Sequence, residues 1–152
     1  MVAYFSMEVC VAPDVPTYAG GLGVLAGDMV RAAADIGLPF VAVTLIHRQG
    51  YFRQRLDEAG RQREEPAEWD VATHLEPLAP RITLTVNGRS VVVRAWRRQV
   101  AGIDGSTVPV YFLDTDFDAN AVEDRALSHA LYGGDPGYRL AQEAVLGIGG
   151  VR

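Results

Sequence analysis

A glycine-rich stretch at residues 18–28, Tyr-Ala-Gly-Gly-Leu-Gly-Val-Leu-Ala-Gly-Asp, constrains this sequence more than any other feature. It follows a short apolar run, Val2–Phe5, and opens a periodic pattern that predicts a helix from about Leu22 to Ile36. Glycines let the backbone turn sharply and let a ligand approach it closely. The first amides of a helix have no intrahelical acceptor, so the stretch can form an anion site, most naturally for phosphate. The alternative is that the glycines only make a tight strand-to-helix turn.

Two common nucleotide-binding motifs do not fit this stretch. The Walker A motif needs a Gly-Lys pair, and all fourteen basic residues of the chain are arginine. The dinucleotide fingerprint needs a third glycine where Ala26 stands, and an acidic residue near the end of the next strand, which reads Val43–Ile46. Neither a P-loop nor an NAD site is supported.

Composition narrows the class of protein further. A chain of 152 residues, about half of them apolar, is long enough for a single domain with its own core. The net charge of −5 argues against a nucleic-acid surface, and no apolar run is long enough to span a membrane. Cys10 is the sole cysteine, and we interpret it as a buried thiol. A chain with one cysteine cannot form an internal disulfide, which fits a cytoplasmic setting.

The order of apolar segments predicts an α/β domain over residues 1–152. Phe40–Ile46 is apolar without alternation, which is typical of a parallel strand covered on both faces. With Val2–Phe5 and the helix between them it predicts a right-handed βαβ unit, and Val108–Leu113 is expected as a third core strand. The helix has an apolar stripe of the kind that faces a core, made of Leu22, Leu25, Met29, Ala33 and Ile36.

Arg81–Val93 contains the clearest hairpin signal. Asn87-Gly88 between two alternating runs predicts a two-residue type I′ turn, in which Leu84 faces Val91. We interpret this hairpin as an antiparallel insertion into the α/β fold.

Polar residues that follow the first two strands are candidates for a site. Glu8 follows the first strand at the sheet edge that usually faces a ligand crevice, although a solvated or Arg-paired acid fits equally well. The segment His47–Arg55 mixes aromatic, amide and guanidinium groups that suit a sugar or a phosphate, or else forms a plain exposed hairpin.

No metal site is predicted. The alternating acids of Asp114–Asp118 do not fit a calcium loop, because Ala119 and Arg125 stand where glycine and glutamate are needed. The three histidines have no partner at metal-ligand spacing.

Several motifs, taken together and in order along nearly the whole chain, resemble bacterial and archaeal α-glucan phosphorylases. They are Tyr4–Glu8, Tyr18–Asp28, Arg48–Gln54, Tyr132–Asp135, Tyr138–Leu140, Gln142–Glu143 and Leu146–Arg152. Gly-Gly-Leu-Gly alone is less specific, because glycogen and starch synthases share it.

The resemblance implies a GT-B fold, in which two Rossmann-like domains enclose the active site. This chain is expected to be the N-terminal domain, truncated at its C-terminus after Arg152. It implies phosphorolysis of α-1,4-glucans (glycogen, maltodextrin) by inorganic phosphate, which releases glucose 1-phosphate. Pyridoxal phosphate would be held by a lysine of the missing C-terminal domain, so no cofactor is expected on this chain alone. The isolated chain is therefore expected to be inactive.

The family's site residues carry over only where the motifs match. The glycine loop, whose backbone amides face sugar and phosphate, corresponds to Gly20, Gly21, Leu22 and Gly23. Glu8 matches an acid beside that loop, and Tyr51 and Gln54 lie on a segment that resembles the crevice wall. No catalytic residue is expected in this chain. Cys10 replaces a tyrosine that lies near the cofactor in long-form animal enzymes, which leaves that contact open.

Two other functions remain open from the sequence. The first is a nucleotide-sugar glycosyltransferase of the glycogen-synthase type, although Ala19 stands where those enzymes usually have a lysine. The second is a non-catalytic carbohydrate-binding fragment.

Overall fold

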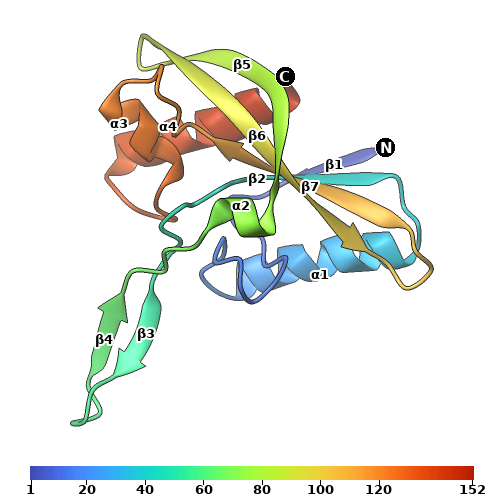
Figure 1. Cartoon of the computed structure of the whole chain (residues 1–152), viewed down its shortest axis with the longest axis horizontal. Coiled ribbons are helices and arrows are strands. Elements are labelled where there is room, and N and C mark those ends of the chain that lie inside the picture. The colour runs from blue at the N-terminus through green and yellow to red at the C-terminus, as the bar shows by residue number, and fades with distance from the viewer.

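The computed structural model describes all residues from Met1 to Arg152 and is built on a five-stranded mixed sheet in the order β1-β2-β7-β6-β5 (Figure 1). The first three strands are parallel: β1 (Val2–Phe5), β2 (Phe40–Leu45) and β7 (Thr107–Asp114). The remaining two, β6 (Arg89–Ala101) and β5 (Glu76–Val86), continue the sheet in antiparallel fashion. The α/β class predicted from the sequence is confirmed.

The predicted βαβ unit is present at the N-terminus. Helix α1 runs from Gly21 to Asp35 and connects β1 to the parallel neighbour β2, within a residue of the predicted bounds. Gly37, with φ of 61°, follows the helix in the left-handed conformation that glycine adopts without strain.

Each face of the sheet buries its own apolar cluster (Figure 1). One cluster lies between the sheet and α1 and includes Val30, Phe40 and Phe112. The other lies under the C-terminal helices and includes Leu45 and Leu84. Strand β2 contributes to both clusters, which explains its uninterrupted apolar sequence.

The predicted orientation of α1 is wrong in one respect. The helix packs Ala26, Ala33 and Ala34 with Val30 into the core beneath the sheet, and Gly27 is buried against the backbone of Cys10. The larger side chains of the predicted stripe, Leu22, Leu25, Met29 and Ile36, are exposed. A helix can pack close to a sheet when small residues face it, and this close approach outweighs the expected burial of the larger stripe.

The β5–β6 hairpin has the predicted turn and register. Asn87 and Gly88 both have positive φ angles, 50° and 77°, and Leu84 pairs with Val91. The hairpin is not a separate insertion, however, because residues 94–101 of β6 pair with β7, where Trp96 lies opposite Phe112.

A second hairpin projects from the body of the molecule (Figure 1). It consists of β3 (Arg53–Leu56) and β4 (Gln62–Glu65), and every residue of both strands is exposed. The short helix α2 (Val71–His74) follows it, with Asp70 as its N-terminal cap.

The C-terminal part covers the second face of the sheet with short helices. They are α3 (Val122–Arg125), the 3₁₀ helix η1 (Ala126–Ser128), α4 (Pro136–Ala144) and the π-helical turn η2 (Val145–Gly149). No helix of the chain combines the length and the apolar character that crossing a bilayer requires.

The close packing of α1 leads to a stability prediction. A Cβ atom at Gly27 would collide with the carbonyl oxygen of Cys10, whereas one at Gly21 would meet open space. We expect Gly27→Ala to lower the free energy of unfolding by about 1–3 kcal/mol, because the rigid backbone must shift. Gly21→Ala is the matched control and should leave stability unchanged or raise it. Urea denaturation of both variants measures the difference, and equal stability would contradict the packing described here.

Candidate functional site

The buried carboxylate of Glu8 lies at the centre of the candidate site, just after β1. Its side chain is 4% exposed, and both of its oxygens accept hydrogen bonds. Oε2 accepts from the backbone amides of Ala19 (2.7 Å) and Gly20 (3.3 Å), and Oε1 accepts from the hydroxyl of Tyr132 (2.7 Å). Glu8 therefore joins the end of β1, the glycine loop and a C-terminal loop, instead of facing an open crevice.

This arrangement divides the amides of the glycine loop into two sets. The amides of Ala19 and Gly20 point inward to Glu8. Those of Gly21, Leu22 and Gly23 form the first turn of α1 and donate to no backbone or side-chain acceptor in the chain. The first turn also contains no acidic residue. The carboxylate of Glu8, next to the N-cap residue Gly20, is the negative charge of the chain that lies at this positive end of the helix dipole, and it leaves these three amides without an acceptor.

Gly23 allows the close approach of Glu8 to the loop. A Cβ atom at Gly23 would lie 2.7 Å from Oε2 of Glu8 and 2.5 Å from Cβ of Tyr18. Any side chain here would push the carboxylate or the loop aside.

Tyr51 lies beside Tyr18 and Ala19, at the start of the glycine-rich stretch. Together with Tyr18, Ala19 and Phe52 it lines a cavity of about 270 Å³. Its ring packs against Phe52, with 4.1 Å between centroids, and meets the edge of Tyr132 at 6.4 Å. Aromatic rings of this kind suit the apolar faces of a sugar.

The structure does not bring Gln54 to this cavity. Gln54 lies on β3 of the projecting hairpin, where it is exposed and opposite Glu64. Of the predicted site residues, the structure therefore gathers Glu8, Tyr51 and the glycine loop.

A second buried carboxylate holds the segment that carries Tyr51. Asp114, at the end of β7, accepts hydrogen bonds from Arg48 (2.6 Å), Arg94 (2.8 Å) and the indole of Trp96 (2.9 Å). Burial alone would raise the pKa of Asp114, but the hydrogen bond and charge of Arg48 outweigh it and hold the pKa below its usual value. Asp114 thus has a structural role, because its carboxylate joins the segment after β2 to strand β6.

His47 is buried beneath the same loops in a left-handed conformation, with φ of 43°. Its Nε2 lies 2.7 Å from the carbonyl oxygen of Met7 and must donate to it, whereas Nδ1 has no partner. Burial is the main cause that lowers its pKa to about 4, so the imidazole is neutral at pH 7.

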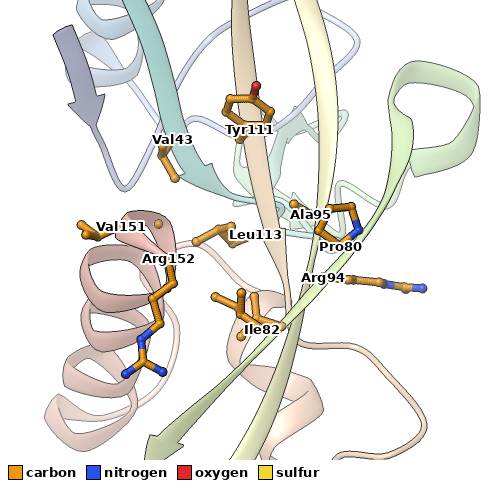
Figure 2. A pocket seen from close by; sticks show the side chains of 12 residues that line it. Val43, Pro80, Ile82, Arg94, Ala95, Tyr111, Leu113, Val151 and Arg152 are labelled. Carbon is orange, nitrogen blue, oxygen red and sulfur yellow. The ribbon is translucent and has the colours of Figure 1, made fainter. Parts of the chain in front are cut away.

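A larger cavity, of about 400 Å³, lies away from these groups, on the face of the sheet that the C-terminal helices cover (Figure 2). Val43, Ile82 and Leu113 line it, and residues 149–152 form one wall. The two arginines at its rim are engaged elsewhere, Arg94 with Asp114 and Arg152 with the carbonyl of Thr83. The cavity is therefore mainly apolar and does not resemble a site for a polar substrate.

No group of three or more His, Cys, Asp and Glu side chains in the chain is arranged to hold a metal ion.

Sequence reasoning did not single out Tyr132 or Asp114 as parts of the site, and it included His47 only as the first residue of the candidate segment His47–Arg55. Tyr132 lies 124 residues from the carboxylate it contacts, and no local pattern joins the two. The only available signal was the Tyr-Gly-Gly motif, which here places Tyr132 in a left-handed conformation with φ of 57°.

Comparison with known proteins shows consistent similarity over almost the entire chain. Glycogen phosphorylase of Mycobacterium tuberculosis is 40% identical over 99% of the chain, and maltodextrin phosphorylase of Thermococcus litoralis is 36% identical over the same share. Glycogen phosphorylase of Aquifex aeolicus is 30% identical. The chain spans 18–22% of the length of these relatives. No family model matches the chain.

The Glu8–Tyr132 contact can be tested with a double-mutant cycle. Tyr132→Phe removes the hydroxyl donor, and Glu8→Gln removes the charged acceptor; each should cost about 1–3 kcal/mol of stability. The two effects should fall short of additivity by about 1 kcal/mol or more, because both changes remove the same hydrogen bond.

Tyr138→Phe is the control for this cycle, since the hydroxyl of Tyr138 donates to the carbonyl of Ala126 and not to Glu8. Combined with Glu8→Gln, it should be additive. Additivity of the Tyr132 pair in urea denaturation would show that the contact contributes nothing.

The lowered pKa of His47 predicts how the stability of the chain depends on pH. Its pKa is about 4 in the folded chain and near 6.5 when unfolded, so between these values the unfolded state binds more protons. Stability should therefore fall as the pH is lowered from about 6.5 to 4, by up to about 3 kcal/mol.

Denaturant titrations at several pH values measure this slope. His47→Asn, which tolerates the left-handed backbone, should flatten it, while His74→Asn should leave most of it. An unchanged slope in the His47 variant would assign the effect to another group.

Proposed function

Because the chain belongs to the α-glucan phosphorylase family and matches an N-terminal portion of the glycogen and maltodextrin phosphorylases, we propose that it forms one wall of a phosphorylase active site. In this proposal the whole protein cleaves α-1,4-glucans with inorganic phosphate and releases glucose 1-phosphate. The chain itself would be the N-terminal Rossmann-like half of a GT-B fold, with the reaction taking place in the cleft between it and a C-terminal domain.

One observation carries the proposal: three successive amides at the start of α1 have no acceptor in the chain. Amides of Gly21, Leu22 and Gly23 at the positive end of a helix dipole favour a phosphate or a developing negative charge. Gly20 keeps an anchoring role, because its amide is already bound to Glu8.

The neighbouring aromatic cavity supports a sugar beside this anion site. Tyr51 and Phe52 line this cavity with apolar surface against which a glucosyl unit can pack, and the Arg48–Asp114 contact holds the segment that carries them. Gln54, on the projecting hairpin, lies outside this set of contacts.

The residues of this chain do not fit covalent attachment of pyridoxal phosphate, the cofactor that the family implies. A Schiff base requires a lysine, and the basic residues here are all arginine. We therefore derive no catalytic step through the cofactor, and the chain's proposed role is to bind and orient the phosphate and the sugar.

Titration with inorganic phosphate, followed by amide NMR shifts, tests the proposal. We expect saturable shifts at Gly21, Leu22 and Gly23, and much smaller shifts at Ala19 and Gly20, whose amides are bound to Glu8. Gly21→Pro removes one of the three donors at the first helical position, where proline is well tolerated. It should raise the Kd for phosphate by about tenfold, the value expected for one lost hydrogen bond to a charged group.

Val122→Pro is the matched control, because it changes the first residue of α3 in the same way. It should leave phosphate binding unchanged. Uniform shifts over the whole surface, or equal effects of the two proline variants, would contradict an anion site at α1. Production of glucose 1-phosphate from maltoheptaose and phosphate by this chain alone would contradict the need for a second domain.

A further inference from the structure

A second cavity, of about 400 Å³, shares a wall with the aromatic cavity beside the glycine-rich stretch. Tyr51 and Phe52 line both cavities, which therefore meet at this pair of rings. The first cavity, of about 270 Å³, reaches Tyr18 and Ala19. The second lies between the segment that follows β2 and the base of the projecting β3–β4 hairpin. We call the two cavities together the Tyr51–Phe52 groove.

Backbone contacts hold the chain at the junction of the two cavities. The amide of Gln49 donates to the carbonyl of His129 (2.8 Å), and the amide of Leu131 donates to the carbonyl of Gly50 (3.0 Å). Gly50 has a φ of 62°, and a Cβ atom there would lie 3.0 Å from the carbonyl oxygen of Pro16. The wall of the groove is therefore formed before any ligand arrives, which lowers the entropy cost of binding.

Two carboxylates of the second cavity have no partner in the chain. Glu64 and Glu68 are exposed and form neither a salt bridge nor a side-chain hydrogen bond, whereas Glu65 pairs with Arg55 at 3.2 Å. No basic residue lines this cavity, so it disfavours an anion. Free carboxylates beside aromatic rings suit a neutral, hydroxyl-rich ligand, because its O–H groups donate to the carboxylates while its apolar faces pack on the rings.

The contents of the two cavities fit a ligand in one direction only. The first cavity adjoins the glycine-rich stretch, where the proposed phosphate site lies. The second has the unpaired acids and no base. A ligand with phosphate at one end and a neutral, hydroxyl-rich remainder places that remainder in the second cavity. Because the first cavity is the proposed place of a glucosyl unit, the remainder is the rest of the same glucan.

We propose that the Tyr51–Phe52 groove binds an α-1,4-glucan across both cavities, with Glu64 and Glu68 holding glucosyl units beyond the one next to the glycine loop. This inference rests on the proposed function, because it places further units of the same glucan. Glu64 and Glu68 are then the residues of this chain that favour long glucans over short ones.

Glucan titrations without phosphate, followed by amide NMR shifts, test this inference. Maltoheptaose has enough glucosyl units to cross the rings, whereas maltose, with two units, is expected to occupy only the first cavity. We expect saturable shifts of the amides of Tyr51, Glu64 and Glu68 with maltoheptaose. Its Kd should be at least about tenfold lower than that of maltose, because only the longer sugar reaches the free carboxylates.

Substitutions separate the two cavities. Glu64→Ala combined with Glu68→Ala should raise the Kd for maltoheptaose about tenfold and leave the Kd for maltose unchanged. Tyr51→Ala should weaken binding of both sugars, because its ring lines both cavities. Glu58→Ala is the matched control, since this exposed glutamate belongs to the same hairpin and lines neither cavity; it should change neither Kd. The amide spectrum of each variant shows whether it is folded.

Four results would overturn the proposal. They are equal Kd values for the two sugars, equal effects of Glu58→Ala and the double glutamate variant, loss of maltose binding in the double variant, and saturable binding of a hexa-arginine peptide without any shift caused by glucan. The last result would assign the free carboxylates to a basic partner.

Phosphate binding gives an independent readout of the proposed function. The double glutamate variant should keep the Kd for phosphate of the unmodified chain, because Glu64 and Glu68 lie outside the glycine loop. Normal phosphate shifts at the start of α1 together with failure of the glucan results would overturn the groove alone. Absent phosphate shifts together with the expected glucan results would overturn the anion site and leave the groove as a glucan site.

Discussion

The carboxylate of Glu8 is the interaction on which the rest of the candidate site depends. A buried carboxylate is stable only when hydrogen-bond donors surround it, and here two loop amides and the hydroxyl of Tyr132 supply them. By taking the amides of Ala19 and Gly20, Glu8 sets the direction in which the chain enters α1. The next three amides have no acceptor in the chain.

The same principle operates a short distance away at Asp114. Its carboxylate draws together the segment after β2, through Arg48, and the strand β6, through Arg94 and Trp96. This contact fixes the direction of the chain before Tyr51, whose ring meets that of Tyr132 edge to face. Two buried acids thus position the loops at the carboxyl ends of the parallel strands, where open α/β sheets usually bind ligands.

Helix α1 connects this site to the outer surface of the molecule. Its glycine and alanine residues let it pack close to the sheet, which leaves its larger apolar residues on the outside. Its two ends differ in electrostatic character, since the first turn lacks an acid and the last turn lacks a base. The amides without an acceptor at the first end are the feature on which the proposed anion site rests.

Local sequence patterns determined the elements of this protein. The bounds of α1, the buried strand β2 and the register of the β5–β6 turn follow from the spacing of apolar residues and from Asn87-Gly88, which depend only on neighbouring residues. Tertiary structure alone decided which face of α1 is buried, that β6 joins the main sheet, and that Glu8 meets Tyr132. These outcomes depend on how closely two elements pack and on which hydrogen-bond donors reach a buried carboxylate. The groups involved lie far apart in the sequence, so no local pattern reveals them.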